Sequence, residues 1–201
     1  TDCAEGAFAA TPQCWNVADF RRRVWGLGLR RDEANGEVRL YYATWGSQGF
    51  GNPDWAAAAE DQKNTMWSIA LSSAGDFNTA SVRREFMLPD FFTSAEDIAR
   101  HGASHPVSDI AFPVLSAQNV MIAAERGGLR NLGLDSENAF AYPHEARALR
   151  YELQPDGRWA VAGRYDIGYY DRRNEGQPFI RANSAGGASF GYGYSQSFEV
   201  D

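Results

Sequence analysis

An internal repeat is the feature that most constrains the fold of this chain. Each copy contains four runs of strand length whose apolar residues alternate over short stretches, whereas a helix would repeat them every three to four positions. The copies begin about 80 residues apart, and the turn before the fourth run contains a glycine in both, at Gly75 and Gly157. Such a repeat predicts a fold built by stacking one supersecondary unit. The runs are residues 24–29, 38–45, 66–71 and 82–88, then 107–112, 120–125, 148–153 and 159–165.

Four short antiparallel strands per repeat are typical of a β-propeller blade. We therefore predict an all-β propeller of four-stranded blades, with two complete blades and part of a third that begins at residues 185–194. A closed propeller needs about four blades or more, so we expect a portion of a larger ring, with an open stack of repeats as the alternative. The expected divisions are a terminal segment (1–23), a first blade (24–90), a second blade with an inter-blade insertion (91–170) and a linker with the third blade's start (171–201). Short helices are expected at 53–62 and 94–100.

Charge and hydropathy limit the kinds of partner. The chain has 26 acidic and 19 basic side chains among 201 residues, and its net charge of -7 opposes binding to nucleic acid. No run approaches the roughly 18 apolar residues of a membrane-spanning helix. We therefore expect the partners to be another protein or further propeller blades.

The two cysteines, Cys3 and Cys14, enclose a short loop near the N-terminus. Such a pair predicts a disulfide that fastens a segment with little core of its own, and two free buried thiols are the alternative. A disulfide favours a periplasmic or extracellular location, with the export signal already removed.

The lengths of the connections predict where the functional surface lies. Since the strands of a blade alternate in direction, connections between second and third strands share an end with connections between blades. All the long connections fall on that end, and long loops on a rigid scaffold concentrate binding residues. The long connections are residues 46–64, 90–106, 127–146 and 171–186, and the short ones are 31–36, 72–77, 113–118 and 154–158.

The long connections contain all three histidines, including His101. Neutral imidazoles and carboxylates suit a divalent ion. We predict no bound cofactor, with calcium as the alternative. The alternative is that these histidines hydrogen-bond loop backbone. The candidate metal ligands are Asp109, His105, His144 and Glu145.

A charged exit from an apolar strand marks a second candidate site. An arginine fork and a carboxylate are usual anchors of an anionic or sugar-like ligand. The same residues would alternatively form a structural ion pair that holds a glycine-rich loop. The candidates are Glu125, Arg126, Arg130 and Asn131.

Four phrases carry resemblances to two groups of known proteins. Residues 149–157 (LRYELQPDG) and 64–71 (NTMWSIAL) resemble third strands of six-bladed propellers of the NHL, strictosidine-synthase-like and gluconolactonase-like group. The resemblance of the whole repeat to this group covers most of residues 24–194. Residues 128–133 (GLRNLG) and 186–194 (GGASFGYGY) resemble loops of soluble quinoprotein sugar dehydrogenases. The first resemblance implies the fold and leaves the activity open, because enzymes, lectins and scaffolds share it.

Two functions follow as expectations. The first is an exported, non-enzymatic propeller module that binds another protein, or docks in a larger extracellular assembly, through its long-loop face. The alternative is a calcium-assisted hydrolase or sugar-oxidising enzyme at the channel mouth, using residues such as Asp109, Glu125, Arg126, His144 and Glu145.

Overall fold

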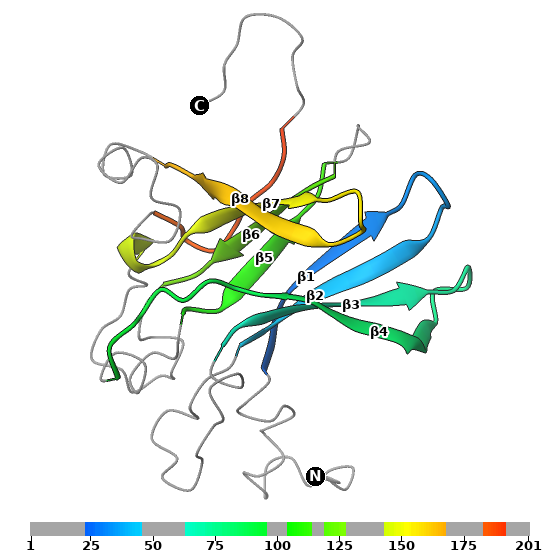
Figure 1. The fold of residues 1–201 in the computed structure, drawn as a ribbon, viewed down its shortest axis with the longest axis horizontal. Helices are drawn as coiled ribbons and strands as arrows, with labels where there is room; N and C mark the ends of the chain where they lie inside the picture. Colours follow the sequence, from blue (N-terminus) through cyan, green and yellow to red (C-terminus); the bar gives the residue numbers. More distant parts are fainter. Residues whose placement is uncertain are drawn as a thin grey trace, which may run out of the picture.

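Two four-stranded antiparallel sheets make up the fold (Figure 1). The computed structural model describes residues 23–45, 63–95, 104–113, 119–127, 143–167 and 183–191. Within them the regular structure is almost entirely strand, which confirms the predicted all-β class. The first sheet has the order β1 (Arg23–Arg31), β2 (Val38–Trp45), β3 (Thr65–Leu71), β4 (Phe77–Met87), and the second has β5 (Val107–Ala111), β6 (Val120–Glu125), β7 (Ala148–Leu153), β8 (Trp159–Tyr165). A 3-10 helix, η3 (Pro143–Glu145), precedes β7.

The strand bounds agree closely with the sequence pattern. Strands β2, β6, β7 and β8 have the predicted limits. Strand β4 differs most, because it begins at Phe77, five residues earlier than the predicted start at Val82. Phe77 pairs with Leu71 directly across the turn, so hydrogen bonding begins there although residues 77–81 are mostly polar.

Glycines close the tight turns of both sheets. Gly75 and Gly157 have φ angles of 89° and 80°, a region that side-chain-bearing residues rarely adopt. The amide of Gly75 donates to the carbonyl of Ser72, and that of Gly157 donates to the carbonyl of Gln154, at 2.9 Å in each turn. The turn chemistry that repeats in the sequence therefore repeats in the structure.

One hydrophobic core lies between the two sheets. Phe86 of β4 stacks on Tyr151 of β7 with ring centroids 4.0 Å apart, and the indole of Trp159 donates to the Tyr41 hydroxyl at 3.4 Å. The inward-facing side chains of each sheet are shielded from water by the other sheet, so the core forms only when the two sheets pack together. The buried core residues are Tyr41, Ala43, Met66, Leu88, Val107, Ile110, Met121, Ala123, Leu149, Tyr151 and Trp159.

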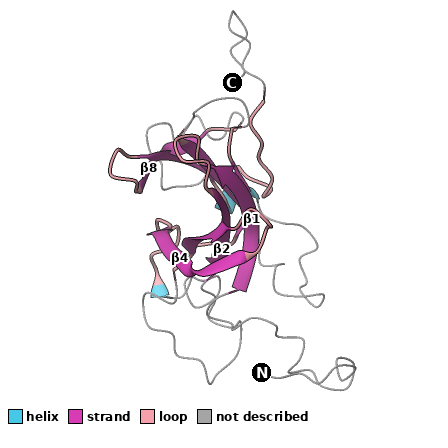
Figure 2. Cartoon of the chain, turned by 90° about the vertical axis from the view of Figure 1, so that its right-hand side faces the viewer, coloured by secondary structure: helices cyan, strands magenta, loops and turns pink. Residues whose placement is uncertain are grey.

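The sheets approach each other most closely where β1 crosses β5. A Cβ at Gly28 would lie 2.5 Å from the carbonyl oxygen of Ile110, and one at Gly26 would lie 2.9 Å from that of Val107. Only glycine allows this approach. The approach of residue 26 to residue 107 and of residue 28 to residue 110 also shows that β1 and β5 run in the same direction. In the view turned by 90°, the sheets form an arc with β1 and β2 near its middle and β4 and β8 toward its ends (Figure 2).

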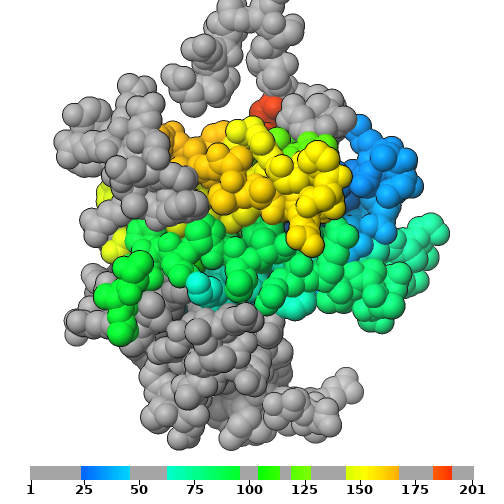
Figure 3. Space-filling model, viewed as in Figure 1, coloured from blue at the N-terminus to red at the C-terminus, as the bar shows by residue number. Residues whose placement is uncertain are grey.

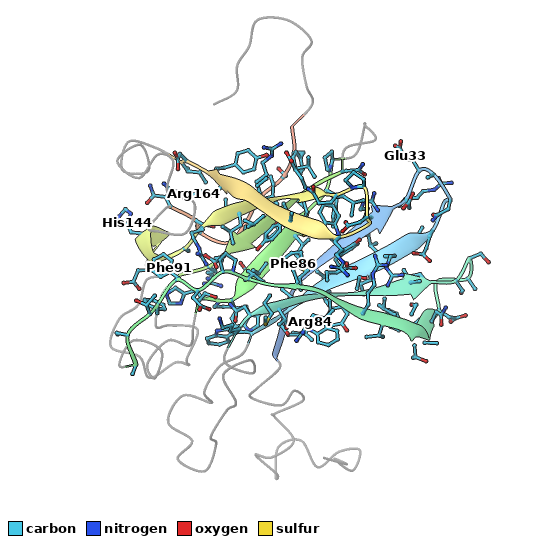
Figure 4. All side chains as sticks on the ribbon, in the orientation of Figure 1. Glu33, Arg84, Phe86, Phe91, His144 and Arg164 are labelled. Atoms are coloured by element: carbon cyan, nitrogen blue, oxygen red, sulfur yellow. The ribbon has the colours of Figure 1, made fainter. Side chains whose placement is uncertain are left out.

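Because β1 and β5 are parallel, corresponding strands of both sheets end on the same side of the molecule. We call the side where β2, β4, β6 and β8 end the long-loop end, and the opposite side the short-turn end. In Figure 4, Glu33 marks the short-turn end, while Phe91 and His144 lie toward the long-loop end. The predicted separation of short turns from the ends that lead into long connections holds for the described strands.

Several predictions fall outside the described residues. These are the Cys3–Cys14 disulfide, the helix at 53–62, most of the helix at 94–100, and His101. The predicted start of a third repeat is described as far as Gly191, and residues 183–191 contain one isolated bridge, between Ala185 and Arg126. The division of the chain at 1–23, 24–90, 91–170 and 171–201 stays a prediction. Among the described residues, no helix has the length and apolar character needed to cross a membrane.

Candidate functional site

A fully buried ion pair lies at the long-loop end of the second sheet. Glu125 ends β6 and Arg147 directly precedes β7, and both side chains are 0% exposed. One carboxylate oxygen of Glu125 accepts from the Arg147 amide at 3.0 Å and from Nε at 2.7 Å, while the other accepts from Nη2 at 2.6 Å. This bidentate arrangement is the strong form of an arginine–carboxylate contact. Arg147 therefore uses both oxygens of Glu125.

The same arginine ties the second sheet to the segment that leaves the first. Nη2 of Arg147 donates to the carbonyl of Pro89 at 2.9 Å, and the guanidinium lies 5.3 Å from the centre of the Phe91 ring. Burial alone would lower the pKa of Arg147, but the Glu125 carboxylate raises it, and the net direction is upward. The guanidinium thus stays charged while it holds the connection between the sheets.

Asn64 performs a similar task at the long-loop end of the first sheet. It directly precedes β3, as Arg147 precedes β7, and it is 1% exposed. Its side-chain amide donates to the carbonyl of His105 at 2.6 Å and to Oγ of Ser104 at 3.0 Å. The indole of Trp45 adds a bond to the Ser104 carbonyl at 3.2 Å. Buried side chains at both sheet ends therefore bond to the backbone of neighbouring connections.

Two histidines lie at this end in different surroundings. His105 is buried, packs edge-on against Phe92, and lies with Nε2 3.4 Å from a carboxylate oxygen of Glu145. His144 instead contacts the side-chain amide oxygen of Asn183 through Nδ1. The structure therefore brings together the predicted metal ligands His105 and Glu145, and gives His144 a different contact.

The fourth predicted metal ligand, Asp109, accepts a hydrogen bond from the Ala188 amide at 2.8 Å. Within the part of the chain that the structure describes, no three histidine, cysteine, aspartate or glutamate side chains form a group suited to a metal ion. Calcium binding stays a prediction, as does the enzymatic alternative that depends on it.

The predicted ligand residues have contrasting positions. Glu125 is engaged with Arg147, whereas Arg126 is exposed beside it, and the Arg126 amide donates to the Pro106 carbonyl at 2.9 Å. Arg130 and Asn131 lie outside the described residues. Sequence reasoning missed Arg147 and Asn64, although each stands directly before an apolar strand.

A groove separates β4 from the turn between β7 and β8. Figure 3 shows the surface of the β7–β8 hairpin next to that of β4. The groove has a volume of about 540 Å³. The Glu85 carboxylate there already accepts from Nε of Arg83 at 2.9 Å. The lining combines three arginines with two acids and two apolar side chains: Arg83, Arg84, Glu85, Phe86, Met87, Asp156, Gly157 and Arg158.

Comparison with known proteins assigns the chain to no family. No family model matches its sequence, and neither a curated protein nor a solved structure matches it.

Proposed function

We propose that this chain is a portion of a β-propeller that serves as an exported binding module and recognises another protein through its long-loop end. The observation that carries the propeller part is the parallel, glycine-seated contact of β1 with β5. Consecutive blades of a propeller repeat one antiparallel four-stranded sheet in the same sense around an axis. The two sheets here have the same strand order and direction.

The residues after the second sheet support the same reading. Oγ of Ser108 donates to the Gly186 carbonyl at 2.7 Å, and Oγ of Ser184 donates to the Glu125 carbonyl at 2.6 Å. Residues 184–188 thus run beside β5 and the end of β6. This is the place where the first strand of a third blade would start.

The use of polar side chains at the long-loop end favours binding over catalysis. The Glu125–Arg147 pair, Asn64 and the Asp109 carboxylate all bond to the backbone of adjacent segments. Such contacts rigidify a scaffold that presents long connections to a partner. A rigid scaffold lowers the entropy cost of ordering a binding surface.

The test compares two exposed apolar side chains at opposite ends. Ile167, two residues after β8, is 50% exposed at the long-loop end, and Phe77 is 61% exposed at the short-turn end. The immobilised chain is used to isolate its protein partner from extracellular fluid of the natural source, and binding is then measured by calorimetry with purified components. We expect Ile167→Asp to weaken binding about tenfold or more, because it replaces buried apolar area by a charge. Phe77→Asp is the matched control and should bind normally; the reverse result would contradict the proposal.

A further inference from the structure

The first sheet has apolar residues on both of its faces. One face, with Tyr41 and Met66, packs in the core against the second sheet. Residues paired across antiparallel strands share a face. Leu29 pairs with Leu40, and Leu40 pairs with Ile69. In the same way, Leu27, Tyr42 and Trp67 form a row. We call the resulting surface, on the side away from the second sheet, the leucine face: Leu27, Leu29, Leu40, Tyr42, Trp67 and Ile69.

The leucine face is open to solvent along β1. Leu27 is 54% exposed and Leu29 is 60% exposed. An antiparallel sheet with one solvated face normally places polar residues on it, whereas a sheet covered on both faces is apolar on both. A contiguous apolar surface of this kind marks a contact site. The first sheet therefore has the pattern of a sheet that is covered on both sides.

The chain itself shows what covers such a surface. At the β1–β5 contact, the branched side chain of Ile110 lies against the bare backbone of Gly28, where a Cβ would come within 2.9 Å of the Ile110 side chain. On the other side of β5, Gly186 lies so close to Ser108 that a Cβ there would come 2.1 Å from its Oγ. Ile110 of β5 thus meets a glycine of the preceding first strand, and Ser108 of β5 meets a glycine of the segment that follows.

These contacts give the array two unlike ends. At one end, Leu27 and Leu29 project from β1. At the other, Gly187 and Gly191 belong to residues 183–191, and a Cβ at either would meet no atom of the described residues within 4 Å. One end has projecting side chains and the other has glycines. This combination also occurs at the β1–β5 contact, where Gly28 of β1 meets the side chain of Ile110 of β5.

We propose that a second copy of this chain covers the leucine face, and that it does so with its own residues 183–191. The contact is head-to-tail, because it continues the β1–β5 interface from one copy to the next. Heterologous contacts of this kind form closed rings when the rotation per subunit closes, and the arc of the two sheets supplies a rotation. The inference rests on the propeller part of the proposed function and names the partner that extends the ring.

The test uses one variant for each end of the array. Leu29→Asp places a charge on the leucine face, and Gly191→Asp places one on the opposite end. We expect the wild type to have a mass that is a multiple of 22.2 kDa by light scattering, and each variant alone to have the monomer mass. An equimolar mixture should form a species of twice the chain mass, because each variant keeps the end that the other lacks.

The control variant is Val161→Asp, which alters an exposed apolar residue of β8 in the second sheet, outside the leucine face, and should leave the wild-type mass unchanged. Far-ultraviolet circular dichroism establishes that each variant is folded. A wild type that stays at 22.2 kDa over the whole concentration range would overturn the inference. So would a Gly191→Asp variant that still assembles while Leu29→Asp does not, because that result indicates a two-fold contact between leucine faces. Neither Leu29 nor Gly191 enters the partner-binding test at Ile167, so a failure here is distinguishable from a failure there.

Discussion

Removing one partner of the Glu125–Arg147 pair should strongly destabilise the fold. Glu125→Gln is nearly isosteric, but it offers one acceptor oxygen where the carboxylate has two. Its amide group would face either Nε or Nη2 of Arg147, which are 2.7 and 2.6 Å from the present oxygens. The guanidinium would keep its charge at 0% exposure after losing the carboxylate that pairs with it.

The magnitude follows from that burial. Breaking a buried ion pair from one side costs about 3–5 kcal/mol. With a urea m-value of about 2 kcal/mol/M, the midpoint of unfolding should fall by about 2 M. Urea denaturation followed by tryptophan fluorescence measures the shift, and an unchanged m-value would show that the variant unfolds from a comparable native state.

The double variant Glu125→Leu/Arg147→Met is the matched comparison. It removes both charges and keeps the volume apolar, so it should lose less stability than Glu125→Gln alone. A loss below about 1 kcal/mol for Glu125→Gln would refute the reasoning, since it falls in the range of exposed ion pairs. A double variant that is less stable than the single one would refute it as well.

Three further predictions concern the contacts between the sheets and their connections. Asn64→Ala should cost about 1–3 kcal/mol in urea denaturation, because it leaves the buried carbonyl of His105 without its donor at 2.6 Å; a neutral result would show that this bond is dispensable. Gly28→Ala should cost about 1–3 kcal/mol or more, because its Cβ would lie 2.5 Å from the Ile110 carbonyl oxygen, and a wild-type thermal midpoint would contradict the close contact. Burial raises the pKa of the Tyr151 hydroxyl far above its ordinary value of 10.0, so Tyr151 stays protonated in the folded chain while it ionises in the unfolded chain. The contribution of Tyr151 to the free energy of unfolding is complete below pH 10 and declines as the pH rises above it, by up to about 1.4 kcal/mol per pH unit. In Tyr151→Phe the free energy of unfolding should decline less steeply above pH 10, and equal slopes for the variant and the wild type would exclude the effect.

Most of the strands were predictable because their sequence signal is local. Strand β7 alternates apolar and polar residues over 149–153 and is followed by the turn that contains Gly157, and β2 follows the turn that contains Gly36, so pattern and turn chemistry agree. The first half of β4 was not predictable, since residues 77–81 have no apolar alternation. They form a strand because the turn at 72–76 places them beside β3.

The candidate site was predictable only in part, because its partners are distant along the chain. Glu125 stood out as a charge at the end of an apolar strand, but its partner Arg147 lies 22 residues later, across a connection whose path no local pattern reveals. A usable signal existed. Since β6 and β7 are antiparallel neighbours, a charge at the end of one lies next to a charge at the start of the other. The same reasoning could have singled out Asn64, which directly precedes β3.

Nuclear Overhauser effects in a sample with labelled isoleucine methyl groups and backbone amides test the order of the first strands. We expect contacts from Ile110 to Gly28 on one side of β5. We also expect contacts between Ser108 and Gly186, and between Asp109 and the Ala188 amide, on the other side. Observation of both sets would establish that β1, β5 and residues 183–191 follow one another as successive first strands. The absence of any contact between Ile110 and Gly28, or of any contact between β5 and residues 186–188, would contradict the arrangement of consecutive blades.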